Sequence, residues 1–443
     1  MRSEPPTPPD VTVAPRPDTT TFVRAYELIT PLFGGGVEPA QADPISSVRA
    51  TEVRGQLRFW WRATRGGQFG RDVTSLKTAE DLLWGSASGS GSAGPSRVDV
   101  QLTLDARGKP YTAVDRQGRS SNARGEQLNI GHPSSIDSYA AFPLNSMRGA
   151  TVLQDVRFSI SVAVHEAPEA AAKAGFTGPL AFEIAAALWA WGTLGGIGAR
   201  TRRGFGALRL RGVGSGEQLD LPPTTSAGAR EWLRERLDTY VVAGTWPEQV
   251  PHLERDHTAL RVLDNPTGSD GMRTWRFLID KLKAFRQQRP INGNRPGRNR
   301  WPEQDEVRRL TGFRSGRHTD EISRVRKFPR AAFGLPLIIQ YKRDDQEDGD
   351  PRGNNTVNVP GKERFASPLL LRPLGTVGAP LGLAIILAGS QVPHTLEMSS
   401  QRGRFPVDTA LTKAEAHAIT KADGHTSLLN GETDVLAAFL KFL

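Results

Sequence analysis

The segment Gly192–Gly206, GTLGGIGARTRRGFG, contains the residue types that bind a phosphate chain. Glycine lets the backbone turn freely and leaves its N–H groups accessible. Arginine adds planar donor forks that fit phosphate oxygens. An apolar, helix-like run at 181–191 precedes the segment and a strand-like run at 206–210 follows it, which is not the order of a nucleotide P-loop. The segment therefore predicts a nucleic-acid backbone site made of Gly195, Gly196, Gly198, Arg200, Arg202, Arg203 and Phe205, in which Phe205 or a nearby aromatic residue stacks on a base. The alternative is a closely packed connection whose arginines lie in solvent.

A second group of cations repeats at helical spacing. Arg54, Arg58 and Arg62 follow one another at i, i+4 and i+8 within the helical pattern of residues 48–65, so they form one basic stripe. The stripe either extends the RNA-binding track or is an exposed helix face, for which Glu52 is the local acidic partner. Trp60 and Trp61 are adjacent and cannot share a helix face, so one of them is expected in the core.

Residues 273–330 hold the positive charge of the chain. They contain 17 Lys and Arg against 6 Asp and Glu, whereas the whole chain has a net charge of +10. Aromatic residues are interleaved with these cations, an arrangement that suits single-stranded nucleic acid because bases stack on rings while cations follow the backbone. The alternative is a solvated basic surface. A stretch rich in Arg, Asn and Gly at 292–300 is expected to become ordered on contact with RNA or a neighbouring subunit.

Composition limits the classes of function. A basic chain of 443 residues attracts polyanions, with nucleic acid as the first expectation. The absence of cysteine excludes disulfides, a thiol nucleophile and a thiolate zinc site. No apolar run approaches the roughly 18–20 residues that span a bilayer, and the first residues lack the apolar core of a secretory signal. We expect a cytoplasmic protein with no membrane partner, no small-molecule substrate and no cofactor.

The fold class indicated is α+β. Strand patterns at 21–33, 98–104, 156–164 and 206–210 alternate with helical patterns at 48–65 and 181–191 in the order β-α-β-β-α-β, which is the ferredoxin-like arrangement of RRM-type modules. We predict a flexible proline-rich tail at 1–20, a first ferredoxin-like domain at 21–212 with a polar insertion at 105–150, a linker with helical character at 213–272, and a second ferredoxin-like domain at 273–443.

A catalytic interpretation has little support from residue types. None of the eight histidines falls in 34–65 or in the glycine-rich segment. His252 and His257 are five residues apart, a spacing that does not place two imidazoles on one helix face, so no metal site is predicted. Asp43 follows the first strand and is the candidate for an aspartate-dependent nuclease, although Asp43-Pro44 is equally explained as a turn.

Two blocks of sequence resemble the RAMP proteins of CRISPR–Cas systems, and more narrowly the subunit-one family of the type III-B Cmr effector. The first runs from ELITPLFGGG at 27–36 to ISSVRATEVRGQLRFWWRA at 45–63. The second is the glycine-rich segment at 192–206. Shorter matches are FGLP at 333–336 and RFASPL at 364–369.

The resemblance implies two ferredoxin-like domains and a place in a ribonucleoprotein that uses a guide RNA to capture complementary transcripts. Its implied partners are guide RNA, target RNA and the other Cmr subunits. It implies that this subunit holds target RNA near the 3′ end of the guide while other subunits cut, so this chain is expected to bind RNA and not to be an enzyme. The alternatives are a RAMP endoribonuclease acting on guide precursor or target RNA, and a scaffold that mainly contacts protein.

Overall fold

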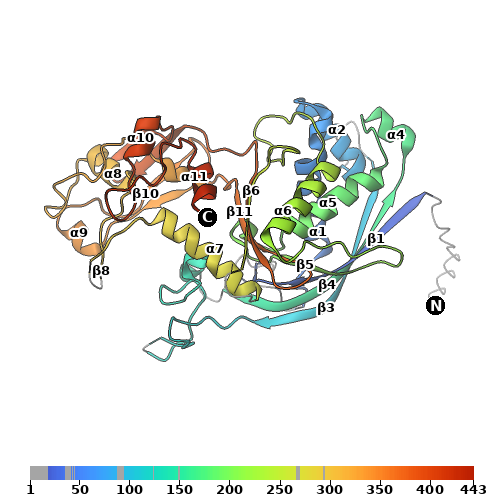
Figure 1. Ribbon diagram of the computed structural model, residues 1–443, viewed down its shortest axis with the longest axis horizontal. Helices are drawn as coiled ribbons and strands as arrows, with labels where there is room; N and C mark the ends of the chain where they lie inside the picture. The colour runs from blue at the N-terminus through green and yellow to red at the C-terminus, as the bar shows by residue number, and fades with distance from the viewer. Residues whose placement is uncertain are drawn as a thin grey trace, which may run out of the picture.

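In the computed structural model (Figure 1), the described residues are 18–34, 41, 43, 45–86, 94–122, 124–147, 150–265, 270–292 and 295–443. Several predictions from the sequence therefore lie wholly or partly outside the described residues: most of the tail at 1–20, the turn at 34–36, part of the low-complexity loop at 85–95, and part of the stretch at 292–300. No helix in the described ranges is long and apolar enough to cross a membrane.

The first half of the chain contains an antiparallel sheet with the strand order β5-β1-β4-β3, and the short β2 pairs with β4 beyond the end of β1. Two helices connect these strands in the order β-α-β-β-α-β, as the sequence predicts. The elements are β1 (Thr19–Leu28), β2 (Leu32–Phe33), α1 (Ala50–Arg65), α2 (Val73–Trp84), β3 (Val98–Pro110), α3 (Ser138–Ala141), β4 (Val152–His165), α4 (Pro168–Lys173), α5 (Leu180–Leu194), β5 (Leu208–Val213) and α6 (Ser226–Tyr240).

Helices α1 and α5 cover one face of this sheet, as Figure 1 shows. Alternating apolar residues of the strands point toward these helices, and the aromatic rings of Tyr26, Phe158 and Trp191 pack together between the layers. Trp60 and Trp61 are both buried, at 2% and 0% exposure, so two tryptophans enter the core where the sequence predicts one. The indole of Trp61 can be buried because its Nε1 donates a hydrogen bond to the buried Glu183 carboxylate at 2.9 Å.

The opposite face of the sheet is polar. The outward positions of the two longest strands are Asp99, Gln101, Thr103, Asp105 and Arg107 on β3, and Arg157, Ser159, Ser161, Ala163 and His165 on β4. RRM modules bind RNA by stacking bases on aromatic residues of their sheet. No Phe, Tyr or Trp occupies these outward positions, so the RRM-like topology does not bring an RRM-like binding face with it.

The second half of the chain repeats part of the same connectivity. Its elements are β6 (Ala259–Leu263), α7 (Gly271–Arg286), β11 (Leu369–Leu374), β12 (Leu381–Ile386) and α11 (Val435–Phe442). The strands pair in the order β11-β12-β6, and no fourth strand joins this sheet in the described ranges. The first strand, β6, lies within residues 213–272, which were predicted to be a linker. The sequence pattern does not reveal this strand because its apolar stretch is short and half-exposed. This sheet alone does not establish a second complete ferredoxin-like domain.

A second sheet in this half has the order β14-β13-β10-β9. The remaining elements of the half are β7 (Ile291–Asn292), β8 (Arg295–Pro296), α8 (Glu303–Thr311), β9 (Leu337–Ile339), α9 (Arg343–Glu347), β10 (Asn355–Asn358), β13 (Thr395–Ser400), β14 (Gly403–Asp408) and α10 (Lys413–Ala418).

The basic region 273–330 differs from its predicted role as a stacking surface. Four of its aromatic residues are buried in the core, at 1% exposure or less: Trp275, Phe285, Trp301 and Phe328. Many of its cations are paired with carboxylates, among them Arg308 with Asp350 at 2.8 Å and Arg330 with Glu303 at 2.9 Å. Most of this segment is therefore protein interior and ion-paired surface.

Candidate nucleic-acid interface

The glycine-rich segment forms a tightly bonded turn between α5 and β5. Its backbone N–H groups are used within the protein: Gly198 donates to Glu52 Oε1 at 2.6 Å, Ala199 to the Phe33 carbonyl at 2.7 Å, and Gly206 to the Pro31 carbonyl at 2.8 Å. Trp191 donates from Nε1 to the Gly196 carbonyl at 3.0 Å. These N–H groups are therefore not free to bind phosphate, contrary to the prediction from sequence.

Close packing explains why these positions are glycine. A Cβ at Gly195 would lie 2.5 Å from Trp60 Nε1, and one at Gly196 would lie 2.9 Å from the Gly206 carbonyl. Gly198 has φ +83° and Gly204 has φ +80°, and a Cβ at Gly204 would lie 2.8 Å from the Leu371 carbonyl. The glycines therefore fit this turn against its surroundings.

Phe205 lies in the core. Its side chain is 0% exposed, and its ring packs edge-on against Trp275 of α7, with the ring centroids 4.9 Å apart. The predicted role in base stacking is wrong for this residue, because α7 of the second half covers the ring. Phe205 instead joins the two halves of the chain.

The basic stripe of α1 is also structural. Arg58 Nε donates to Glu80 Oε1 at 2.6 Å and Arg62 Nη1 donates to the same oxygen at 2.7 Å. Arg54 donates to the backbone carbonyls of Trp84 and Val98. These three arginines bind α1 to α2 and β3, so the prediction that they extend the RNA track is not supported by their contacts.

The three arginines of the turn have a different environment. Arg200 Nε donates to the Ala140 carbonyl at 2.9 Å, Arg203 Nη2 donates to the Phe333 carbonyl at 2.9 Å, and Arg202 donates to the Ser367 carbonyl. Arg286, at the end of α7, donates to the Tyr139 hydroxyl at 3.2 Å and lies over the Phe333 ring. We call Arg200, Arg202, Arg203 and Arg286 the arginine cluster.

The arginine cluster holds uncompensated positive charge. None of its four guanidinium groups pairs with a carboxylate in the described part of the chain, whereas Arg58, Arg62 and most cations of 273–330 do. Two buried donors, Arg203 Nη1 and Arg286 Nε, have no hydrogen-bond acceptor. Burial, followed by the charges of Arg286 and Arg200, lowers the pKa of Arg203 to about 9. An anion placed here would supply both the missing charge and the missing acceptors.

The arginine cluster lies where the segments that resemble the RAMP family, at 27–36, 192–206, 333–336 and 364–369, come together. Leu335 and Phe365 exchange backbone hydrogen bonds of 2.9 and 3.1 Å, which pairs the segments 333–336 and 364–369. Arg203 bonds to the first of these segments and Arg202 to the second. The segment 27–36 supplies the carbonyls of Pro31 and Phe33. Folding therefore joins pieces that are far apart in the sequence into one junction around the turn.

Two residues of this junction were not predicted. Arg286 lies at the end of a helix in the basic region 273–330. Nothing in the sequence distinguishes it from the other Lys and Arg residues of that region. Arg372 is 1% exposed within the apolar strand β11, LLLRPL, and donates to the carbonyls of Gly195, Leu208 and Pro373. A lone arginine in an apolar strand was the available signal, because a buried charge needs specific partners.

Glu52 gives a test of how the turn is held. Burial raises the pKa of this carboxyl, and Oε2 is buried without a partner while Oε1 accepts from Gly198. Because the pKa of Glu52 is higher in the folded than in the unfolded chain, its protonated form contributes to the free energy of unfolding at low pH. This contribution is lost as pH rises through the folded-state pKa. Glu52→Gln, which resembles the protonated acid, should therefore raise the melting temperature at pH 7 and give no gain near pH 4. Equal shifts at the two pH values would contradict this account.

Catalytic and metal candidates lie elsewhere. In the described ranges, one group of three residues could hold a metal ion, His318, Asp345 and Asp350, but the Asp350 carboxylate already accepts from Arg308, the Ser315 N–H and His318. His252 stacks on Trp246, with centroids 4.3 Å apart. Asp43 Oδ1 accepts from the N–H groups of Ile45 and Ser46 at 2.8 and 2.9 Å, and these bonds lower the pKa of its carboxyl, as in a turn.

Known proteins similar to this chain include subunits of CRISPR systems. The RAMP superfamily model matches residues 25–154. CRISPR system Cmr subunit Cmr1-2 of Pyrococcus furiosus is 28% identical over 198 residues, which cover 42% of this chain and 92% of that protein. Subunit Cmr1-1 of the same organism is 24% identical over 323 residues, which cover 71% of this chain and 78% of that protein.

The chain is similar to Cmr1 proteins and, over residues 25–154, to the RAMP superfamily. The matched residues include α1, α2 and β3, but only the end of β1 and the start of β4, and they do not reach β5. Among solved structures, the chain is similar to apo Cmr1 from Pyrococcus furiosus, with a TM-score of 0.46, 19% identity, and coverage of 85% of this chain and 90% of that one. It is also similar to a chain of the type III-B Cmr-beta complex bound to cognate target RNA, with a TM-score of 0.47, 11% identity, and coverage of 85% and 96%.

Proposed function

We propose that this chain is a non-catalytic, RNA-binding subunit of a type III-B CRISPR–Cas effector, and that it helps to hold target RNA near the 3′ end of the guide. The names of its relatives support the assignment to a Cmr complex, since both are Cmr subunits. Guide RNA, target RNA and other Cmr subunits are its proposed partners.

The arginine cluster is the observation that carries the proposal. Four guanidinium groups lie at one junction without a carboxylate partner among the described residues, and two of their buried donors lack an acceptor. Phosphate oxygens supply both charge and acceptors, so a ribose-phosphate backbone suits this junction. The absence of aromatic rings at the outward positions of β3 and β4 favours binding through phosphates over stacking on those strands.

The salt dependence of binding tests the proposal. Affinity of the purified chain for single-stranded RNA should fall linearly on a log-log plot against salt concentration, with a slope of roughly 0.7 per phosphate contact. Filter binding at a series of salt concentrations measures this slope. A chain with no affinity for RNA that still binds partner Cmr subunits would instead be the protein scaffold, and the proposal would be wrong.

The non-catalytic part of the proposal needs a separate experiment. The hydrogen bonds of the arginine cluster involve carbonyl and hydroxyl groups, with no histidine or carboxylate to transfer protons. Labelled RNA incubated with the chain, with and without Mg²⁺, should therefore remain intact. Cleavage that is lost in Asp43→Ala would support the endoribonuclease alternative instead.

A further inference from the structure

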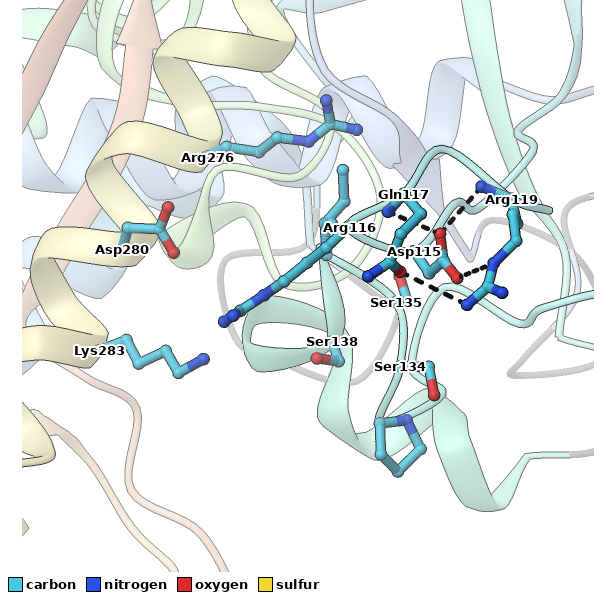
Figure 2. Close-up of a pocket in the computed structure, with 12 residues that line it drawn as sticks. Asp115, Arg116, Gln117, Arg119, Ser134, Ser135, Ser138, Arg276, Asp280 and Lys283 are labelled. Atoms are coloured by element: carbon cyan, nitrogen blue, oxygen red, sulfur yellow. Dashed lines mark hydrogen bonds and ion pairs between the residues drawn. The ribbon is translucent and has the colours of Figure 1, made fainter. Parts of the chain in front are cut away.

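A pocket of about 670 Å³ lies between α7 and the insertion that connects β3 to β4. Figure 2 shows its main charged groups, with Asp280 and Lys283 on α7 facing Arg116 on the insertion. Its size is in the range of small-molecule and nucleotide sites. The pocket shares α7 and α3 with the arginine cluster: Arg286 is on α7, while the Tyr139 hydroxyl and the Ala140 carbonyl that bind the cluster are on α3.

The charged groups of this pocket fall into two sets. Arg119 is paired with Asp115 at 2.8 Å, and Arg276 with Asp137 at 2.8 Å, so these cations have protein partners. The side chains of Arg116, Asp280 and Lys283 form no hydrogen bond or ion pair within the described part of the chain, although the charges of Lys283 and Arg116 act on Asp280. Two cations and one carboxylate are therefore available to a ligand.

A carboxylate between two free cations selects the chemistry of the ligand. Inorganic phosphate would bind the cations but would be repelled by Asp280. A ligand with both an anion and a hydrogen-bond donor satisfies all three groups, and a ribonucleotide has both, in its phosphate and its 2′-hydroxyl. The 2′-hydroxyl is common to all four ribonucleotides, so its recognition suits a protein that leaves sequence to base pairing.

We propose that this pocket binds one ribonucleotide of the RNA strand, with the phosphate at Arg116 and Lys283 and the 2′-hydroxyl donating to Asp280. This inference rests on the proposed function and adds to it the residue that distinguishes RNA from DNA. A strand that lies on the arginine cluster reaches the pocket along α3 and α7, so the two sites bind successive parts of one strand.

The sign of the effect of Asp280→Leu, which removes the acceptor oxygens together with the charge, tests the proposal. The substitution removes a negative charge, so a purely electrostatic surface would bind RNA and DNA more tightly to the same extent. If Asp280 accepts the 2′-hydroxyl, affinity for RNA should fall and affinity for DNA should not. Oligouridine and oligodeoxyuridine of about 12 nucleotides are suitable probes, since only the 2′-hydroxyl differs.

We expect the wild-type chain to prefer oligouridine by about three- to tenfold, the value of one hydrogen bond to a charged group. Asp280→Leu, which leaves no acceptor for the 2′-hydroxyl, should bring the two affinities to within about twofold of each other. Asp344→Leu, which removes a carboxylate from the exposed helix α9, is the matched control and should leave the ratio unchanged. Lys283→Ala should weaken the binding of both oligouridine and oligodeoxyuridine and leave the ratio of the two affinities unchanged.

Two outcomes would overturn the pocket assignment: a wild-type chain that binds both strands equally, or a ratio that Asp280→Leu does not change. Either result leaves the proposed function standing if oligouridine still binds with a salt-dependent affinity. If the wild-type chain binds neither strand, both proposals are wrong.

Discussion

Arg200→Gln, Arg203→Gln and Arg286→Gln, combined in one chain, should lower affinity for single-stranded RNA by about 100-fold at low salt. The estimate takes about 1 kcal/mol for each lost charged contact. The salt slope should decrease by about 2, since each phosphate contact contributes roughly 0.7. Glutamine keeps a donor for the carbonyls of Ala140 and Phe333 that Arg200 and Arg203 contact, so the junction should remain folded. Filter binding and thermal unfolding of the same preparations measure both effects.

A matched control removes the same number of charges elsewhere. Arg71, Arg107 and Arg157 are exposed and have no carboxylate partner within the described residues, and two of them lie on the open face of the first sheet. Their combined replacement by glutamine should change RNA affinity by less than about fivefold, through the loss of net charge alone. Equal losses of RNA affinity in the two triple variants would show that the affinity depends only on the total charge of the chain. That result would contradict a site at the arginine cluster.

Arg372→Met should lower the free energy of unfolding by about 3 kcal/mol, which takes about 1 kcal/mol for each of three buried carbonyls left without a donor. These are the carbonyls of Gly195, Leu208 and Pro373. Methionine fills a similar volume, so the loss reports the hydrogen bonds more than a cavity. The buried charge itself is unfavourable, as the lowering of the Arg372 pKa to about 9 by burial indicates, and its removal offsets part of the loss. Denaturant unfolding measures the result.

Arg209→Met is the control for this second prediction. Arg209 also lies near the turn, but its side chain is 35% exposed and is paired with Glu27. Partly exposed ion pairs contribute about 0–1 kcal/mol, so this variant should lose much less stability. Equal losses in the two variants would mean that Arg372 is not a specific connection between β11 and the turn.

The first ferredoxin-like sheet could be predicted from local pattern. The apolar alternation of β1 and β4 and the long apolar run of α5 are strong signals within one element. The strand β6 could not be identified in the same way, because ALRVL is short and half-exposed and its pairing partner, β12, lies more than a hundred residues further along the chain.

The site residues show a similar limit. Arg200, Arg202 and Arg203 were identified from their residue types and from the lack of nearby carboxylates, and the structure places them at one junction without such partners among the described residues. The partner of Arg58 and Arg62 is Glu80, on the following helix α2, which an inspection of α1 alone could not reveal. Phe205 is buried by a ring of α7, a contact between halves of the chain that no local pattern encodes.

The sequence of the turn contains glycines that the packing of the turn requires and arginines that this packing does not require. Gly195, Gly198 and Gly204 are fixed by neighbouring atoms, and Gly198 and Gly204 also by left-handed backbone angles, so any chain that builds this junction needs them whether or not it meets RNA. A relative with these glycines but with neutral residues in place of Arg200, Arg203 and Arg286 would keep the architecture and lose the capacity to attract a polyanion. Under the proposed function, the glycines specify the fold and the cations beside them specify the RNA binding that the fold serves.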